Sequence, residues 1–158
     1  MRRRYGEVMT PRTLFRIFAN AEMVTWALLL SALLSRAVGG PDFVTIAGGT
    51  HGFIFLSYCV TTVFVWVNQR WSAGRGIAGV ALAVVPFAPV PFERSLEKRG
   101  LLDGPWRLAP GGDTPSGFIE HVQAWILRHP VVSVIILVAL VAIVFSVLLY
   151  LGPPIPRG

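Results

Sequence analysis

Four stretches of the chain are almost entirely apolar, and short polar segments separate them. The cleanest, Val131–Leu151, has no charged residue and lies between Pro130 and Gly152. A second stretch runs from about Thr45 to Val67, and His51 is its only residue that can be charged. A hydrocarbon core of about 30 Å requires about 20 predominantly apolar residues. Both stretches are therefore predicted to be transmembrane helices.

The first apolar stretch, Leu14–Leu34, is less pure, because Arg16, Asn20 and Glu22 lie in its first three turns. Arginines precede it, as in a signal peptide, but the leader before the apolar run is too long and Glu22 borders that run. We therefore predict an uncleaved membrane span.

The third stretch, Ile77–Phe92, is short and contains Pro86, Pro89 and Pro91. Proline ends or kinks a helix, so the second half is predicted to be bent or extended. Small residues in the first half would let neighbouring helices approach closely. The pattern favours a packed third span and leaves a re-entrant segment open.

The connector at residues 93–117 is polar and rich in glycine and proline. After Thr114 and Pro115, which are typical of an N-cap and a first helical position, apolar and polar residues alternate with helical spacing over 118–129. This pattern indicates a helix on the membrane surface or, equally, the start of a longer, tilted final helix.

The predicted fold class is therefore all-α, an integral membrane helical bundle. It has a three-helix core, an amphipathic interfacial helix and a fourth, C-terminal transmembrane helix. The predicted segments are a basic N-terminal segment (1–12), the membrane core (13–92), the connector (93–117), the interfacial helix (118–129), the last span (131–151) and a tail (152–158).

Composition agrees with a membrane protein. Of 158 residues, 54% are hydrophobic and 14% are charged, whereas soluble domains carry about 25% charge. The net charge of +6 lies in segments between apolar runs and forms no groove with interleaved aromatics, so nucleic acid is not an expected partner. The single cysteine, Cys59, cannot form an internal disulfide. We expect a multi-pass protein of the cell membrane.

Positive charge in the connecting segments decides its orientation only weakly. The counts on the two sides are nearly equal, and the N-terminal arginines favour placing both termini in the cytoplasm.

Four polar residues inside the predicted spans are candidates for a functional role: Arg16, Glu22, His51 and Tyr58. Arg16 is expected to snorkel to the headgroups. Glu22 lies about 12 Å deep, where a carboxylate is costly. If the second span runs antiparallel, Tyr58 lies at the same depth and His51 roughly 10 Å away. Glu22 is therefore predicted to face the bundle and to contact Tyr58 rather than His51.

These polar residues form no complete catalytic set. His51 has no second histidine within the spans to share a haem or metal, and no nucleotide-binding or metal-binding spacing occurs. We therefore expect no enzyme activity, catalytic residue, cofactor, metal or small-molecule substrate.

Several short motifs follow one another in order along the first 102 residues. They are Leu14-Phe15-Arg16-Ile17, Ala21-Glu22 with Trp26, His51-Gly52 at the start of the second apolar stretch, and Pro86-Phe87 with Phe92-Glu93-Arg94 at the end of the third. Over residues 13–102 the chain resembles the YdzA-like small integral membrane family of unknown function. The resemblance implies a compact three-helix protein without established enzymatic activity. It carries over no catalytic residue, and only Arg16, Glu22 and His51 match its polar positions.

The stretch Trp66–Trp71 with Phe92-Glu93-Arg94 resembles actinobacterial members most. This resemblance implies a bacterial plasma membrane and a relative that is a small accessory subunit of a cytochrome bc–cytochrome oxidase supercomplex. The chain departs from the family pattern by its extension from about Asp103 onward.

The leading functional hypothesis is a non-catalytic structural or accessory subunit, in a respiratory complex by the resemblance. Its partners would be the lipid bilayer and other membrane proteins or further copies of itself. The alternative is a small oligomeric transporter or channel in which Glu22 is a proton-sensitive group.

Overall fold

The computed structural model describes residues 9–151, in which all regular elements are helices. The chain divides into two compact units at Arg107, and each is described by itself. Within the described residues the units comprise 9–107 and 108–151. The predicted tail at 152–158 and most of the basic N-terminal segment lie outside the described residues.

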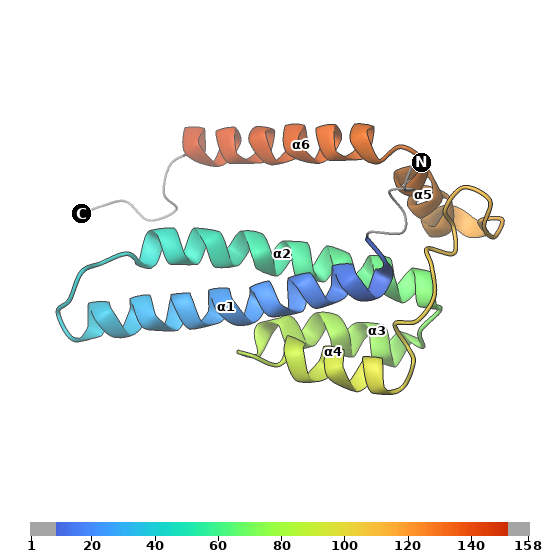
Figure 1. Cartoon of the computed structure of the whole chain (residues 1–158). Coiled ribbons are helices and arrows are strands. Elements are labelled where there is room, and N and C mark those ends of the chain that lie inside the picture. The colour runs from blue at the N-terminus through green and yellow to red at the C-terminus, as the bar shows by residue number, and fades with distance from the viewer. Residues whose placement is uncertain (1–8, 152–158) are drawn as a thin grey trace, which may run out of the picture. The chain divides into compact units, whose positions relative to one another are not determined.

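Helices α1 (Pro11–Ala37) and α2 (Val44–Gln69) form an antiparallel hairpin, seen as the two long ribbons in Figure 1. Helix α1 begins where the Thr10 hydroxyl accepts a hydrogen bond from the Thr13 amide at 3.1 Å, with a proline in the first position. Helix α2 ends at Gln69, and its C-cap, Arg70, has a left-handed φ of 51°. Both helices extend beyond the predicted apolar stretches.

Both helices are long and apolar enough to cross a membrane. Their 27 and 26 residues correspond to about 40 Å of helix. In the most apolar window of each, only 22% and 28% of the residues are buried. The core helix of a soluble protein would be mostly covered, so the low burial of these helices is typical of membrane-spanning helices.

The third apolar stretch differs from the prediction, because it is not one helix. It forms α3 (Ala73–Ala81), the short 3-10 helix η2 (Leu82–Val84) and, after a turn, α4 (Pro89–Lys98). The α3 and η2 helices together rise about 18 Å, which is too short to cross a bilayer. The third stretch is therefore not one continuous helix over 77–92.

The chain reverses in the turn between η2 and α4. The Ala88 amide donates to the Val85 carbonyl at 3.2 Å, which closes a β-turn around Pro86 and Phe87. Proline suits the second position of such a turn, and Phe87 has a φ of 65°, the left-handed value that the third position of a type II turn requires. The prolines thus bend the chain, as predicted, but the part that follows is helical rather than extended.

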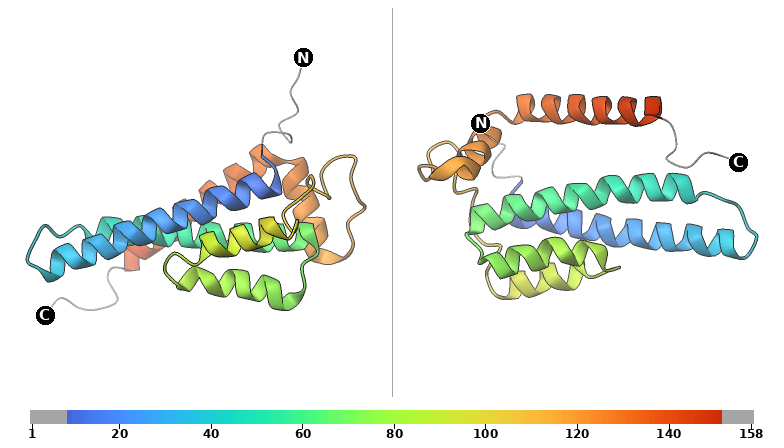
Figure 2. Two further views of the ribbon diagram at one scale, coloured as in Figure 1. Left: turned by 60° about the horizontal axis from the view of Figure 1, so that its bottom comes forward. Right: turned by 180° about the vertical axis from the view of Figure 1, so that it is seen from behind.

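The α3–α4 hairpin begins and ends at the same end of the first unit. Near its tip, the Trp26 indole donates to the Ala83 carbonyl at 3.3 Å, in the middle of α1. At its base, the Trp71 indole donates to the Leu101 carbonyl at 3.0 Å. Figure 2 shows this shorter hairpin beside the longer one. The third stretch is therefore a helical hairpin, and a re-entrant position in a membrane, which the sequence left open, stays a prediction.

Four aromatic side chains, from α1, α2, the α2–α3 connection and α4, form the centre of this unit. The Phe15 ring centroid lies 5.6 Å from Tyr58, 5.9 Å from Trp71 and 6.3 Å from Phe92. Tilted and edge-on contacts of this kind are favoured between aromatic rings. The cluster joins the two hairpins at the end where both begin.

The second unit contains α5 (Gly117–Arg128) and α6 (Pro130–Leu151). The N-cap of α5 is Ser116 rather than the predicted Thr114, and the Glu120 carboxylate accepts from the Ser116 amide at 2.8 Å. Helix α5 exposes Phe118 and Trp125, and it ends at Arg128, with His129 as its C-cap before α6 begins. The helix at 118–129 is thus separate from the last one, and its place on a membrane surface stays a prediction.

Candidate functional site

Glu22 faces the interior of the α1–α2 hairpin, as predicted, and is fully buried. Its Oε2 lies 3.8 Å from Nδ1 of His51, which is also buried. The Tyr58 hydroxyl instead donates to the Gly79 carbonyl at 3.2 Å. The preference for Tyr58 over His51 as the partner of Glu22 is therefore wrong.

The register of the hairpin explains this error. Phe15 packs on Tyr58, and Thr25 lies within hydrogen-bond distance of His51, so Glu22 falls opposite the turn of α2 that contains His51. The prediction placed both helix starts at the surfaces of a 30 Å core. In the structure α1 continues to Ala37, and the short connection to Val44 fixes which residues lie opposite each other.

Thr25 determines the hydrogen bonds of this buried cluster. Its hydroxyl donates to the Glu22 carbonyl at 3.2 Å and lies 3.2 Å from Nδ1 of His51. Because a hydroxyl has one hydrogen, its oxygen is left to accept from an Nδ1–H of His51. Neither carboxyl oxygen of Glu22 has a hydrogen-bond partner among the described residues. The carboxyl group is thus the chemically unsatisfied member of the cluster.

Arg16 makes specific ion pairs, which the snorkelling interpretation did not foresee. Its Nε lies 3.1 Å from Oε1 of Glu93, whose side chain is buried, and its guanidinium also pairs with Glu97. One turn earlier, Arg12 pairs with Glu97, at 3.8 Å, and with Asp103. Two arginines four residues apart on α1 thus meet two glutamates four residues apart on α4. This matched spacing was the one signal in the sequence for the contact.

The end of α2 is fixed by the segment that follows α4. The Arg107 amide donates to Oδ1 of Asn68 at 2.8 Å, and its guanidinium donates to the carbonyls of Asn68 and Val67, each at 3.2 Å. A cation at this position satisfies free carbonyls and opposes the negative end of the helix dipole. The Trp106 indole donates to the Met9 carbonyl at 2.6 Å, which ties the same segment to the start of α1.

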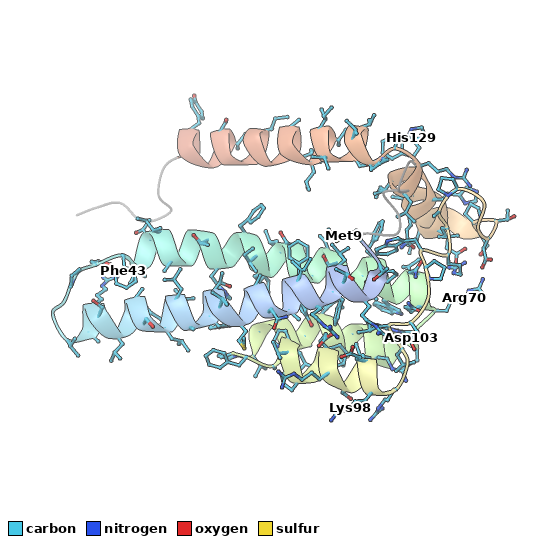
Figure 3. All side chains as sticks on the ribbon, viewed as in Figure 1. Met9, Phe43, Arg70, Lys98, Asp103 and His129 are labelled. Carbon is cyan, nitrogen blue, oxygen red and sulfur yellow. The ribbon has the colours of Figure 1, made fainter. Side chains whose placement is uncertain are left out.

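Basic residues of the first unit gather at one end, which we call the basic end. Figure 3 shows Met9, Arg70, Lys98 and Asp103 at this end and Phe43 at the opposite one. The basic end holds Arg12, Arg16, Arg70, Arg75, Arg94, Lys98, Arg99 and Arg107. At the other end of residues 9–107, Arg36 lies 3.8 Å from Asp42. The sequence count missed this asymmetry because it assumed that the third stretch crosses the membrane.

Within residues 9–151 no group of three or more His, Cys, Asp or Glu side chains is placed to hold a metal ion. The structure thus brings together Glu22 and His51, and separately Arg16 with the acids of α4. Tyr58 belongs to the packing between α2 and α3.

Comparison with known proteins gives one family. The model of a domain of unknown function, DUF3817, matches residues 12–98, which is more than half of the chain. The match includes α1, α2 and the α3–α4 hairpin. No curated protein and no solved structure matches the chain.

Proposed function

The chain belongs to the DUF3817 family of domains of unknown function, and from this premise we propose that it is a non-catalytic integral membrane protein. It acts as a structural or accessory subunit that packs against another membrane protein. Three finer points belong to this proposal. The chain is a YdzA-like protein, it is of the actinobacterial type, and it acts in a respiratory complex.

The proposed orientation in the membrane is based on the position of the basic end. Cytoplasmic segments of membrane proteins carry an excess of Lys and Arg. We therefore place the basic end in the cytoplasm of a bacterial cell, with α1 and α2 as spans and the α3–α4 hairpin entering and leaving on the cytoplasmic side. In this proposed arrangement the third stretch does not cross, and a crossing by α6 would put the two termini on opposite sides, unlike the sequence prediction.

The main support for the accessory role is an open face of α2 around Gly49 and Gly52. At Gly49 and Gly52, nothing lies within 4 Å of the position that a Cβ would take. Ile46, Phe53 and Leu56 are exposed beside them. Small residues between large apolar ones let the backbone of another helix approach closely in a membrane, where packing rather than hydrophobicity drives association. This face supports a contact with a helix of a partner protein.

A substitution at Gly49 tests the contact without disturbing the hairpin. Gly49→Leu fills open space, so we expect the chain to fold and insert normally. In the complex, overpacking by about 1–3 kcal/mol should reduce the amount of partner that co-purifies in mild detergent at least fivefold. Ala27→Leu, at an exposed position of α1, is the matched control and should leave the amount unchanged.

A photo-crosslinker at Phe53 identifies what covers the face. We expect a crosslink to a different membrane protein that Gly49→Leu removes. A crosslink formed only to residues 108–151 of the same chain, or a chain that emerges alone from every mild extraction, would contradict the accessory role.

A further inference from the structure

The two faces of α4 differ in how their charges are satisfied. Glu93 and Glu97 face α1 and pair with its arginines. Arg94, Lys98 and Arg99 are exposed, and their side chains have no ion pair or hydrogen bond with the described residues. Because α1 already neutralises the acids of α4, three cations remain available for an external anion.

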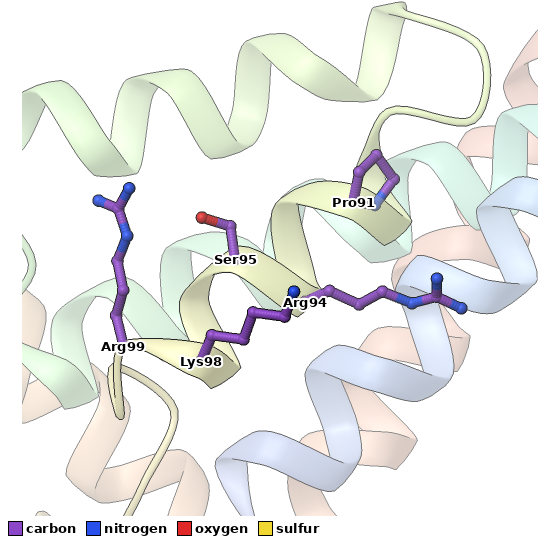
Figure 4. Close-up of a pocket in the computed structure, with 5 residues that line it drawn as sticks. All are labelled: Pro91, Arg94, Ser95, Lys98 and Arg99. Atoms are coloured by element: carbon purple, nitrogen blue, oxygen red, sulfur yellow. The ribbon is translucent and has the colours of Figure 1, made fainter.

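These cations line an open hollow at the surface of α4. Its lining residues all come from α4 or the residue after it, and Figure 4 shows them: Pro91, Arg94, Ser95, Lys98 and Arg99. The hollow has a volume of about 420 Å³, and no acidic side chain lines it. Guanidinium, ammonium and hydroxyl groups are all donors that suit the oxygens of a phosphate group.

The same hairpin is apolar at its tip. Val84, Val85 and Phe87 are exposed there, and Ile77 is exposed on α3. The base of the hairpin is thus cationic, and its tip is apolar. An anionic phospholipid has the same division between its headgroup and its acyl chains, whereas a free phosphate ion would make no use of the apolar tip.

We propose that the hollow on α4 binds the phosphate group of an anionic phospholipid, with the acyl chains along the α3–α4 hairpin. This inference rests on the proposed membrane location, in which the basic end lies at the cytoplasmic headgroups. The cytoplasmic leaflet carries the anionic lipids in many membranes, and each Lys or Arg at its surface strengthens binding about fivefold. The lipid would hold the re-entrant hairpin in its place.

Lipid titration of the full-length chain in detergent tests the site. Native mass spectrometry would measure binding of dioleoylphosphatidylglycerol against dioleoylphosphatidylcholine, which has the same acyl chains. We expect the wild type to prefer phosphatidylglycerol, and R94Q/K98Q to lower that preference at least tenfold. The control R36Q/R128Q removes two exposed arginines outside the hollow and should keep the preference.

Several results would overturn the inference. These are equal binding of the two lipids by the wild type, an equal loss in the control, or displacement of phosphatidylglycerol by millimolar inorganic phosphate, which would indicate a soluble-anion site. R94K/R99K keeps the charge and should keep the preference, which separates a loss of charge from a loss of fold.

Incorporation into phosphatidylcholine vesicles tests the membrane location separately. A chain that inserts there without lipid preference contradicts only the lipid site, and a chain that stays in the water phase contradicts both proposals.

Discussion

At the scale of single residues, Glu22 is the least satisfied group of the described structure. Its carboxyl is fully buried and its oxygens accept no hydrogen bond, while the adjacent His51 is engaged by Thr25. Burial of a polar group without a hydrogen bond costs about 1–3 kcal/mol, and more if it is charged. Glu22 therefore lowers the stability of the α1–α2 hairpin.

Replacing Glu22 with leucine should therefore raise stability. We expect Glu22→Leu to increase the free energy of unfolding by about 1–3 kcal/mol, because an apolar side chain of similar size removes the unsatisfied oxygens. Thr25→Val should lower it by about 1 kcal/mol, because it removes a hydrogen bond that is made. Denaturant or thermal unfolding in detergent measures both.

A loss of stability in Glu22→Leu would show that the carboxyl makes an interaction of its own. Such a result would contradict the conclusion that Glu22 is left unsatisfied in the α1–α2 hairpin.

The sequence was sufficient to predict that Glu22 faces inward, because a carboxylate deep in an apolar helix has few other places to lie. It was not sufficient to identify the partner, since the register depends on the connection between α1 and α2. It also missed the pairing of Arg16 with Glu93, which joins residues far apart in the chain.

At the scale of elements, the α3–α4 hairpin depends on close approach at two glycines. A Cβ at Gly76 would overlap the ring of Trp66, which is held by a hydrogen bond to the Trp71 carbonyl at 2.9 Å. A Cβ at Gly79 would lie 2.8 Å from the Thr62 methyl group. These glycines let α3 pack directly on α2.

Two alanine substitutions in α3 separate packing from helix propensity. Gly76→Ala should lower the free energy of unfolding by about 1–3 kcal/mol, because the Trp66 ring must move. Gly74→Ala adds a methyl group where nothing lies within 4 Å, and should raise stability slightly through helix propensity. Chemical unfolding of the two variants in the same detergent checks the contrast. Equal effects would mean that α3 does not pack closely on α2.

The long helices were predictable from the sequence, and the third stretch was predictable only in part. Length and apolar composition alone predict α1, α2 and α6 closely. The small residues and prolines of residues 77–92 predicted close packing and a bend. They did not predict a full reversal, because that depends on the left-handed conformation of Phe87, a residue type that rarely adopts it.

At the scale of the whole molecule, the reversal of the third stretch decides how the positive charges of residues 9–107 are distributed. With the hairpin folded back, all lysines and arginines of residues 9–107 except Arg36 lie towards one end. A crossing third stretch would divide them between the two sides. The charge asymmetry therefore exists only if the third stretch folds back as a hairpin.

Cysteine accessibility tests this arrangement most directly. In a Cys59→Ala background, single cysteines would replace Pro41 in the α1–α2 connection, Ser72 before α3 and Arg99 after α4, all of which are exposed. A membrane-impermeant maleimide would be applied to intact and to permeabilised bacterial cells. We expect Pro41→Cys to react in intact cells, and Ser72→Cys and Arg99→Cys to react only after permeabilisation. Reaction of Ser72→Cys and Arg99→Cys from opposite sides would show that the third stretch crosses the membrane and would contradict the arrangement proposed for this protein.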